Sequence, residues 1–447
     1  MSTSPSAPSA LLTGWGLTAP TRARVLRPSA VPDAAALLEA AGARGVIARG
    51  LGRSYGDAAQ NAGGDVLDMT GLNHVVAFDA ERGLLTAGAG LALGELARLA
   101  LARGWFSPVM PGTSQVTIGG AIAADVHGKN HHADGAFSAH VRSFELLTAD
   151  GAQRTVTPDG DPETFRATAG GMGLTGVVLE ATVALTPVPS DRMRVDVERT
   201  RDLDDVMDRM EREDAGYRHS VAWIDCLERR RLGRSVLIRG NHAPPGATVA
   251  RAYESGRSLG VPPGVPGGLL TSLTVRTFNE LYYRRAPAQQ RGRLEPLDTF
   301  FHPLDGVRDW NRLYGPRGLL QYQFLVPFGA HETLRAIIAR LAAERRPAFL
   351  AVLKRFGPGH GMLSFPAPGW TLAVDLPAGD PGLRATLDAF DEQVAAAGGR
   401  VYLAKDSRLR PELLEAMYPE LPLWRAARNR LDPEGRLRSD LARRLGL

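Results

Sequence analysis

The sequence contains a single cysteine, Cys226, among its 447 residues. One thiol excludes an intramolecular disulfide and any metal or iron–sulfur site built from several cysteines. The surrounding stretch SVAWIDCLE is largely apolar, so we expect this thiol to be buried and unreactive. The chain must therefore fold around hydrophobic cores alone, and its length favours two domains.

Long hydrophobic runs are also absent. No stretch of about 18 apolar residues occurs, so we expect no segment to span a bilayer. The start of the chain, MSTSPSAPSALLTGWG, lacks a basic region followed by an apolar core, and no secretory signal can be read from it. We expect a protein of the cytoplasm or of the cell-envelope (periplasmic) face, and these features allow peripheral attachment to a membrane surface.

Neither basic nor acidic side chains are in large excess. The sequence has 53 basic and 48 acidic side chains, which gives a formal net charge of +5. A protein that follows a nucleic-acid backbone needs a larger and more concentrated basic excess. We therefore expect no nucleic-acid partner.

Glycine, in contrast, is abundant and gathers in three segments at residues 50–56, 112–128 and 170–176. The densest stretch is PGTSQVTIGGAIAADVHGKNHH at 111–132. Glycines let backbone amides approach a ligand closely, and the Thr and Ser hydroxyls add donors. Such surfaces suit the diphosphate of a nucleotide cofactor, although similar turns also occur in loops that bind nothing.

Two of the glycine patterns imitate a dinucleotide-binding fingerprint, but neither satisfies it. Gly88, Gly90 and Gly94 are spaced one residue too widely, and no acid follows at the ribose position. The stretch GGMGLTG at 170–176 follows a predicted helix and precedes a predicted strand, the reverse of the required order. The sequence therefore does not predict a Rossmann unit.

The periodicity predicts an α+β fold in two parts. The first part has a flexible lead at 1–30, helices at 31–43, 91–103 and 162–169, and strands at 66–69, 75–78, 84–88, 143–148, 153–157 and 177–185. After the proline-flanked boundary TPVPS, the second part has strands at 319–326, 348–353 and 370–376 and helices at 332–344 and 383–397. Gln321 and Gln323 lie two apart on one predicted strand and so share a face. They fit either a polar ligand pocket or a hydrogen-bonded core pair.

Several longer stretches occur in a fixed order: ARGLGRSYGDAAQN, MPGTSQVTIGGAIAADVHGKNHH, GGMGLTG, FFHPLD, YGPRGLLQYQF, KRFGPGHGMLSFPAPGW and YLAKDSR. Together they resemble the decaprenylphosphoryl-β-D-ribose 2′-oxidase family, FAD enzymes of the vanillyl-alcohol-oxidase (PCMH) type. The resemblance implies an FAD-binding domain formed by 1–191 plus 400–447. It also implies an antiparallel-sheet substrate-binding domain at 192–399.

The resemblance also implies which residues bind FAD. These are Ala48, Arg49, Gly50, Leu51, Gly52, Arg53, Ser54, Tyr55, Gly56, Asp57, Ala58, Gly112, Thr117, Ile118, Gly119, Gly120, His127, Val178 and Tyr402. Related oxidases often attach the flavin covalently through a histidine in the first loop. Arg53 occupies that position here, so we expect non-covalent FAD.

The implied reaction is oxidation of the ribose 2′-hydroxyl to a 2′-keto sugar, with hydride transfer to the flavin. An NADH-dependent keto-reductase would then complete epimerisation to the arabinose donor for cell-wall arabinan. Lys405, in AKDSR, would stabilise developing negative charge and contact the sugar, with His127 and Tyr55 beside the flavin. Gln321, Gln323, Lys354 and Lys405 would line the substrate pocket. The group that takes the hydroxyl proton is not assigned.

Three positions depart from the family pattern. Ala373 replaces a cysteine to which covalent nitroaromatic inhibitors attach, Phe301 replaces a frequent tyrosine, and Thr371 replaces a frequent asparagine. The histidines of HGKNHH have no acid or cysteine at ligand spacing, so we expect no metal. Two other functions stay open at this point: an FAD oxidase of a soluble sugar or alditol, and an inactive flavin-bearing scaffold for a partner reductase.

Overall fold

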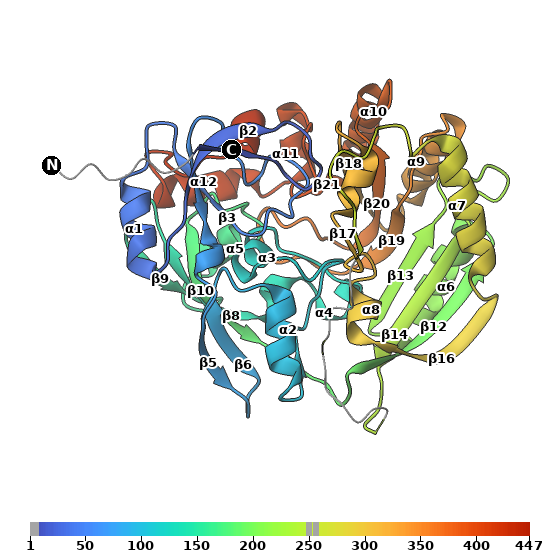
Figure 1. Cartoon of the computed structure of the whole chain (residues 1–447), viewed down its shortest axis with the longest axis horizontal. Coiled ribbons are helices and arrows are strands. Elements are labelled where there is room, and N and C mark those ends of the chain that lie inside the picture. Colours follow the sequence, from blue (N-terminus) through green and yellow to red (C-terminus); the bar gives the residue numbers. More distant parts are fainter. Residues whose placement is uncertain (1–8, 247–252, 254–258) are drawn as a thin grey trace.

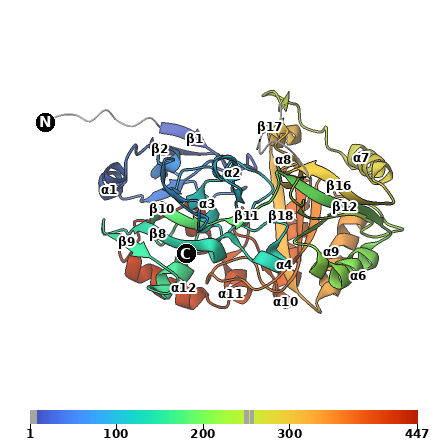
Figure 2. The same cartoon turned by 90° about the horizontal axis from the view of Figure 1, so that it is seen from below.

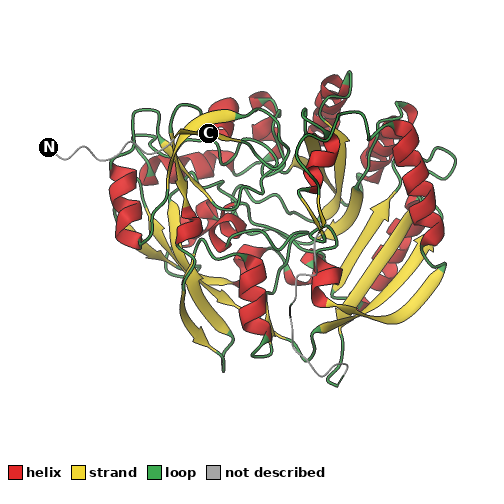
Figure 3. Cartoon of the chain, in the orientation of Figure 1, coloured by secondary structure: helices red, strands yellow, loops and turns green. Residues whose placement is uncertain are grey.

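The computed structural model describes residues 9–246, 253 and 259–447. Helices and strands alternate along the chain and are distributed over both halves of the molecule (Figures 1 and 3). The strands are β1 (Ser9–Leu12), β2 (Thr21–Leu26), β3 (Val46–Arg49), β4 (Asp65–Asp68), β5 (Val75–Asp79), β6 (Leu84–Gly88), β7 (Trp105–Phe106), β8 (Val141–Leu147), β9 (Gln153–Val156), β10 (Val177–Ala184), β11 (Thr186–Pro187), β12 (Arg192–Thr200), β13 (His219–Ile224), β14 (Ser235–His242), β15 (Leu259–Gly260), β16 (Gln289–Pro296), β17 (Val307–Arg308), β18 (Leu319–Pro327), β19 (Ala351–Phe356), β20 (Gly369–Pro377) and β21 (Arg400–Val401).

The α-helices are α1 (Val31–Glu39), α2 (Leu93–Leu101), α3 (Ile118–Ala123), α4 (His131–Asp134), α5 (Pro162–Thr168), α6 (Leu203–Glu213), α7 (Ser272–Arg285), α8 (Leu297–Phe301), α9 (His331–Ala343), α10 (Leu383–Ala396), α11 (Leu414–Met417), α12 (Leu421–Leu431) and α13 (Asp440–Leu445). No helix in the described part of the chain is long and apolar enough to cross a membrane.

Three sheets organise these elements. Strands of the first part form a four-stranded sheet, β1-β2-β4-β3, and a five-stranded sheet, β5-β6-β10-β8-β9. The second part forms an eight-stranded sheet, β16-β12-β14-β13-β19-β20-β18-β21, whose neighbouring strands are all antiparallel. The two parts lie on the left and right of Figure 1. The predicted α+β class is confirmed.

The prediction of a flexible lead at 1–30 is wrong for the residues that the structure describes. Strand β1 pairs antiparallel with β2, and β2 pairs parallel with β4. The alternation in TRARVL places Ala23, which is buried, and Val25, which is partly buried, on one face, and Leu26 is buried at the end of the strand. Arg24 on the other face makes two hydrogen bonds with Asp65 of β4, at 2.6 and 2.7 Å. Proline and serine around the strand concealed this pattern.

The C-terminal segment returns to the first part of the chain. Leu437 forms a parallel bridge with Val46 at the end of β3. The Trp424 indole donates a hydrogen bond to Ala167 O at 2.9 Å, and Arg444 forms an ion pair with Asp57 at 2.8 Å. Helices α12 and α13 therefore pack against the glycine-rich half of the molecule, as the ribbon shows (Figures 1 and 2).

The eight-stranded sheet has two different faces because successive side chains point to opposite sides. Helix α10 packs on one face, where Tyr322 contacts Phe390 at 6.0 Å between ring centroids. Helices α6 and α9 lie on the same face (Figure 2). The other face, which carries Gln321, Gln323 and Trp223, looks toward the first part of the chain. Only this second face is free to form a site.

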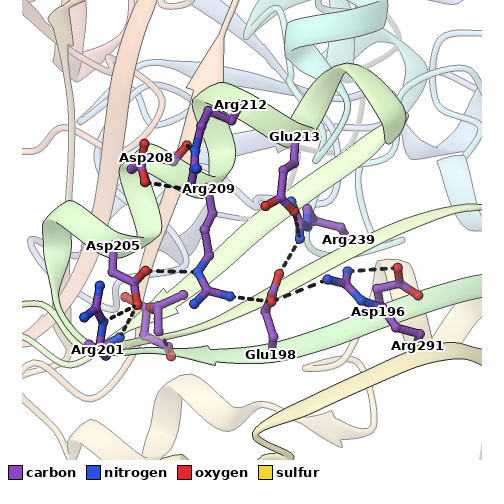
Figure 4. A network of polar contacts seen from close by, with 12 residues as sticks. Asp196, Glu198, Arg201, Asp205, Asp208, Arg209, Arg212, Glu213, Arg239 and Arg291 are labelled. Atoms are coloured by element: carbon purple, nitrogen blue, oxygen red, sulfur yellow. Dashed lines mark hydrogen bonds and ion pairs between the residues drawn. The ribbon is translucent and has the colours of Figure 1, made fainter.

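A network of charged side chains fastens α6 to the sheet (Figure 4). Buried Glu198 of β12 pairs with Arg239 of β14, and it accepts a hydrogen bond from Arg209 of α6 at 2.6 Å. Arg239 also pairs with Glu213, at the end of α6, at 2.8 Å. Breaking such a buried pair leaves an uncompensated charge and costs about 3–5 kcal/mol. The network holds the strands whose opposite face carries Trp223 and Ile238.

Candidate active site

A cavity of about 800 Å³ lies between the two parts of the molecule. This volume is toward the upper end of the range of about 300–1,000 Å³ that is typical of small-molecule sites. All three glycine-rich segments reach the cavity, through Gly50 and Gly52, Gly112 to Gly120, and Gly173 and Gly176. On the opposite wall lie side chains of β13, β14, β18, β19 and β20. The three glycine-rich segments, which are far apart in the sequence, therefore converge on one cavity.

The first two glycine-rich loops pack directly against each other. A Cβ on Gly50 would collide with the Thr117 side chain, so only glycine allows this approach. Thr117 in turn caps helix α3, since its Oγ1 accepts a hydrogen bond from the Gly120 amide at 3.2 Å. The Tyr55 amide donates to Ala404 O at 2.9 Å, which brings the C-terminal AKDSR segment to the same loop.

Most residues predicted to bind the cofactor line this cavity. Three of them, Gly56, Asp57 and Ile118, do not line it. Gly56 packs against the Asp406 carbonyl, and the Asp57 carboxylate pairs with Arg444. Ile118, the first residue of α3, is buried in the core. The predicted substrate residues Gln321, Gln323, Lys354 and Lys405 all line it. So do the predicted catalytic residues Tyr55, His127 and Lys405.

The chain has only three lysines, Lys129, Lys354 and Lys405, and all three line the cavity. Burial lowers the pKa of Lys405 to about 7, that of Lys129 to about 7 and that of Lys354 to about 8. The charge of Lys354 adds to this lowering of the pKa for both other lysines. The cavity therefore concentrates three lysines at partly buried positions, where each interacts more strongly with an anionic ligand than it would in bulk water.

Lys405 lies at the centre of a four-residue cluster. Its Nζ is 3.9 Å from the centroid of the Tyr55 ring. Gln321 Nε2 donates hydrogen bonds to Tyr55 Oη at 3.1 Å and to Asp375 Oδ1. Burial raises the pKa of Asp375 to about 7, and its carboxylate in turn raises the pKa of Lys405 against the effect of burial. The acid and the lysine therefore set each other's charge.

Asp375 is the functional candidate that the sequence reasoning missed. It is fully buried, and its Oδ2 has no hydrogen-bond partner among the described residues. A usable signal existed, because Asp375 lies two residues after Ala373 on a strand that the sequence correctly predicted. Alternation along a strand places both on one face. Ala373 itself lines the cavity.

His127 belongs to a second cluster near Gln323. Gln323 Nε2 donates to His127 Nε2 at 3.0 Å, which leaves the proton of a neutral imidazole on Nδ1. The Nδ1 atom is buried and has no partner in the part of the chain that the structure describes. Burial, with Lys354 nearby, holds the pKa of His127 well below its usual range. The neutral ring thus offers one donor that a bound ligand can satisfy.

The other residues of HGKNHH have separate partners. Lys129 donates to the Phe300 carbonyl, and His132 Nε2 lies 3.0 Å from Tyr217 O. His131 Nδ1 accepts from the Gly357 amide at 3.1 Å. Among the described residues, no group of three or more His, Cys, Asp or Glu side chains is arranged to hold a metal ion.

Cys226 is buried, as expected, and burial raises the pKa of its thiol. It does not line the cavity. Arg53 does line it, with its guanidinium 4.0 Å from the centroid of the Trp15 ring. Its Nε has no partner among the described residues and is therefore available to a ligand.

Comparisons with known proteins agree with this geometry. The sequence model of the FAD binding domain matches residues 22–157, and that of D-arabinono-1,4-lactone oxidase matches residues 378–445. The chain is 43% identical to the decaprenylphosphoryl-β-D-ribose oxidase of Mycolicibacterium smegmatis, over 98% of this chain and 97% of that protein. It is 44% identical to an uncharacterised protein of Streptomyces coelicolor, over 80% of this chain and 100% of that protein. It is 26% identical to an alditol oxidase of a Streptomyces species, over 98% and 99% of the two chains. The chain belongs to the decaprenylphosphoryl-β-D-ribose oxidase family of FAD-dependent oxidoreductases.

Proposed function

We propose that this protein oxidises the 2′-hydroxyl of decaprenylphosphoryl-β-D-ribose to the 2′-keto sugar with FAD as its cofactor. The observation that carries the proposal is the 43% identity to a decaprenylphosphoryl-β-D-ribose oxidase over 98% of the chain. The reaction is the first half of an epimerisation to the arabinose donor of cell-wall arabinan. An NADH-dependent keto-reductase at the same membrane surface would consume the product.

The cavity fits the cofactor on physical grounds. Residues 48–55, Ala58, Gly112, Thr117, Gly119, Gly120, Val178 and Tyr402 would hold FAD. The unpaired donors of Arg53 and His127 face a cavity that an anionic, hydrogen-bonding ligand would satisfy. In this arrangement residues 1–191 and 400–447 serve as the FAD domain, and residues 192–399 as the substrate domain.

The chemistry divides between the cofactor and the protein. FAD supplies the hydride acceptor. The protein orients the sugar through Gln321, Gln323 and Lys354 and excludes water from the buried cluster. Protonated Lys405 stabilises negative charge as it develops, and the Asp375 carboxylate, which accepts a hydrogen bond from Gln321, favours the protonated form of Lys405.

Gly112 offers a direct test of where the cofactor lies. It lines the cavity, and a Cβ added there would meet no atom within 4 Å, so a larger side chain would extend into open space. We expect Gly112→Leu to fold but to bind FAD at least about tenfold more weakly, a loss of about 1.4 kcal/mol. Titration of apoprotein with FAD, followed by flavin fluorescence, measures this. Gly42→Leu, at an equally open glycine outside the cavity, is the control and should bind FAD normally. Normal affinity in both variants would place FAD elsewhere.

The flavin should also be released by acid. Arg53, in the first loop, cannot form a covalent bond to the flavin. Cys226 is buried and does not line the cavity, so it cannot form one either. Purified protein should be yellow, and acid precipitation should leave the flavin in the supernatant. A pellet that keeps its yellow colour would contradict non-covalent binding.

Substrate class can be decided by anaerobic spectroscopy of the same preparation. Addition of farnesyl- or decaprenylphosphoryl ribose should bleach the flavin absorbance. The similarity to an alditol oxidase favours one rival, oxidation of a soluble polyol. Bleaching by a free pentose or polyol, but not by the lipid-linked sugar, would select that rival. A yellow protein that no sugar reduces would select the inactive scaffold.

A further inference from the structure

Exposed apolar side chains are concentrated in one part of the chain. Among the described residues, eight of the fourteen large apolar side chains that are exposed lie between residues 259 and 307. Five of them occupy α7 and the residues just before it, and we call this surface the α7 face. Its members are Leu269 (47% exposed), Leu273 (75%), Phe278 (41%), Leu281 (64%) and Tyr282 (38%). An exposed cluster of this kind marks an interaction surface more often than chance.

The exposed leucines of the α7 face are not what holds the helix in place. Val275, Asn279 and Tyr283 form the buried stripe of α7. Asn279 donates to Asp225 at 2.8 Å, and Tyr283 Oη donates to Thr200 O at 3.1 Å. The helix is therefore fixed from its inner side, while its outer leucines stay exposed.

The charges around these leucines have one predominant sign. Arg276, Arg284 and Arg285 are exposed on α7, and Glu280 is the only acid of the helix. Glu280 is already paired, with Arg234 at 2.7 Å and with Arg284 at 2.5 Å. Arg276 and Arg285 have no ion-pair partner among the described residues. Leucines surrounded by free arginines match the surface of an anionic bilayer, where apolar side chains insert and basic ones meet phosphate groups.

The α7 face is also continuous with the cavity. Phe278 and Tyr282 belong both to this face and to the cavity lining. Inside, the Tyr282 ring lies 4.7 Å from that of Trp223, and the Phe278 ring lies 4.9 Å from that of Phe349, between centroids. These aromatic side chains connect the outer surface with the cavity by an apolar path.

We propose that the α7 face rests on an anionic lipid bilayer, and that the polyprenyl chain of the substrate passes from the bilayer over Phe278 and Tyr282 into the cavity. The second half of this statement rests on the proposed function. The first half depends only on the surface. Figure 2 shows α7 at an outer rim of the molecule, where a flat surface can reach it.

The test uses the full-length FAD-bound protein and sedimentation with lipid vesicles. The parent should bind vesicles that contain phosphatidylglycerol and phosphatidylcholine, and bind more weakly to phosphatidylcholine alone. Leu273→Asp and Leu281→Asp should each weaken binding at least about tenfold. Arg276→Gln together with Arg285→Gln should weaken it on anionic vesicles only. Leu423→Asp, at a leucine that is 57% exposed on α12, is the matched control and should bind like the parent.

Activity separates this surface from the proposed function. Leu273 and Leu281 do not line the cavity, so turnover of a water-soluble, short-chain phosphoryl ribose should be unchanged in both variants. Turnover of decaprenylphosphoryl ribose in vesicles should fall. If the protein binds vesicles but turns over no lipid-linked ribose, the proposed function is wrong, and the α7 face is still a membrane-binding surface. Equal vesicle binding by the parent, Leu281→Asp and the control would contradict the proposal that the α7 face binds membranes. The proposal would also be wrong if the parent did not bind vesicles but formed a dimer that Leu281→Asp converts to a monomer.

Discussion

Replacement of Lys405 by methionine is expected to slow reduction of the flavin by substrate about 10²–10³-fold, the loss typical of one removed electrostatic contact at a developing charge. Methionine keeps the length and most of the volume of the side chain but has no charge. The FAD content should not change, because Lys405 itself is not among the residues that would hold the cofactor, and methionine can still contact the Tyr55 ring. Stopped-flow absorbance under anaerobic conditions measures the effect directly.

The matched control is Lys354→Met. Lys354 lines the same cavity, but on β19 it pairs with Thr371 of β20, outside the Lys405 cluster. We expect this variant to raise KM for the lipid-linked sugar more than it lowers kcat, since it removes a binding contact. If Lys405→Met reduces its flavin at the parent rate, Lys405 has no part in stabilising charge. The inactive scaffold would then be the better account of the protein.

The three lysines illustrate what a sequence can and cannot predict. The motifs that resemble a known family predict that Lys405 and Lys354 belong to the site. The alternation of LLQYQFLV predicts that Gln321 and Gln323 lie on one face of a strand. That Lys129, Lys354 and Lys405 share one cavity is a tertiary fact. These residues come from segments more than 50 residues apart, and no local period relates them. The lowering of the pKa values of Lys129 and Lys405 by the charge of Lys354, in addition to the effect of burial, follows from this convergence.

The errors have local physical causes. Strand β2 was missed because prolines and serines surround a short alternating run, and its stabilising partner, Asp65, lies 41 residues away. Strand β19 begins at Ala351, three residues after the predicted start; Leu350 still accepts one hydrogen bond from the Asp375 amide of β20. The Pro/Gly-rich stretch 246–268 predicts a surface loop, and eleven of its residues, 247–252 and 254–258, lie outside the described residues. Its described end carries Leu259, which pairs with Val307.

Replacement of Asp375 by asparagine should change the pH dependence of the reaction rather than only its rate. The Asp375 carboxylate raises the pKa of Lys405, which burial alone would lower further. Removing an adjacent opposite charge typically shifts a pKa by about 1–3 units. We therefore expect the Lys405 pKa to fall from about 7 to about 6 or below. The active, protonated form is then lost at a lower pH.

The sign of this effect gives a sharp test. The rate falls as pH rises through the pKa of Lys405, so the alkaline limb of kcat/KM should move to lower pH in Asp375→Asn. At pH 8 the loss should be about tenfold for a shift of one unit, whereas at pH 5.5 the variant should approach the parent. Asp309→Asn, which removes an acid from the cavity wall that does not act on Lys405, should leave the profile unchanged. A uniform loss at every pH would mean that Asp375 merely supports the packing of β18 against β20, because a structural defect has no reason to disappear when Lys405 becomes protonated.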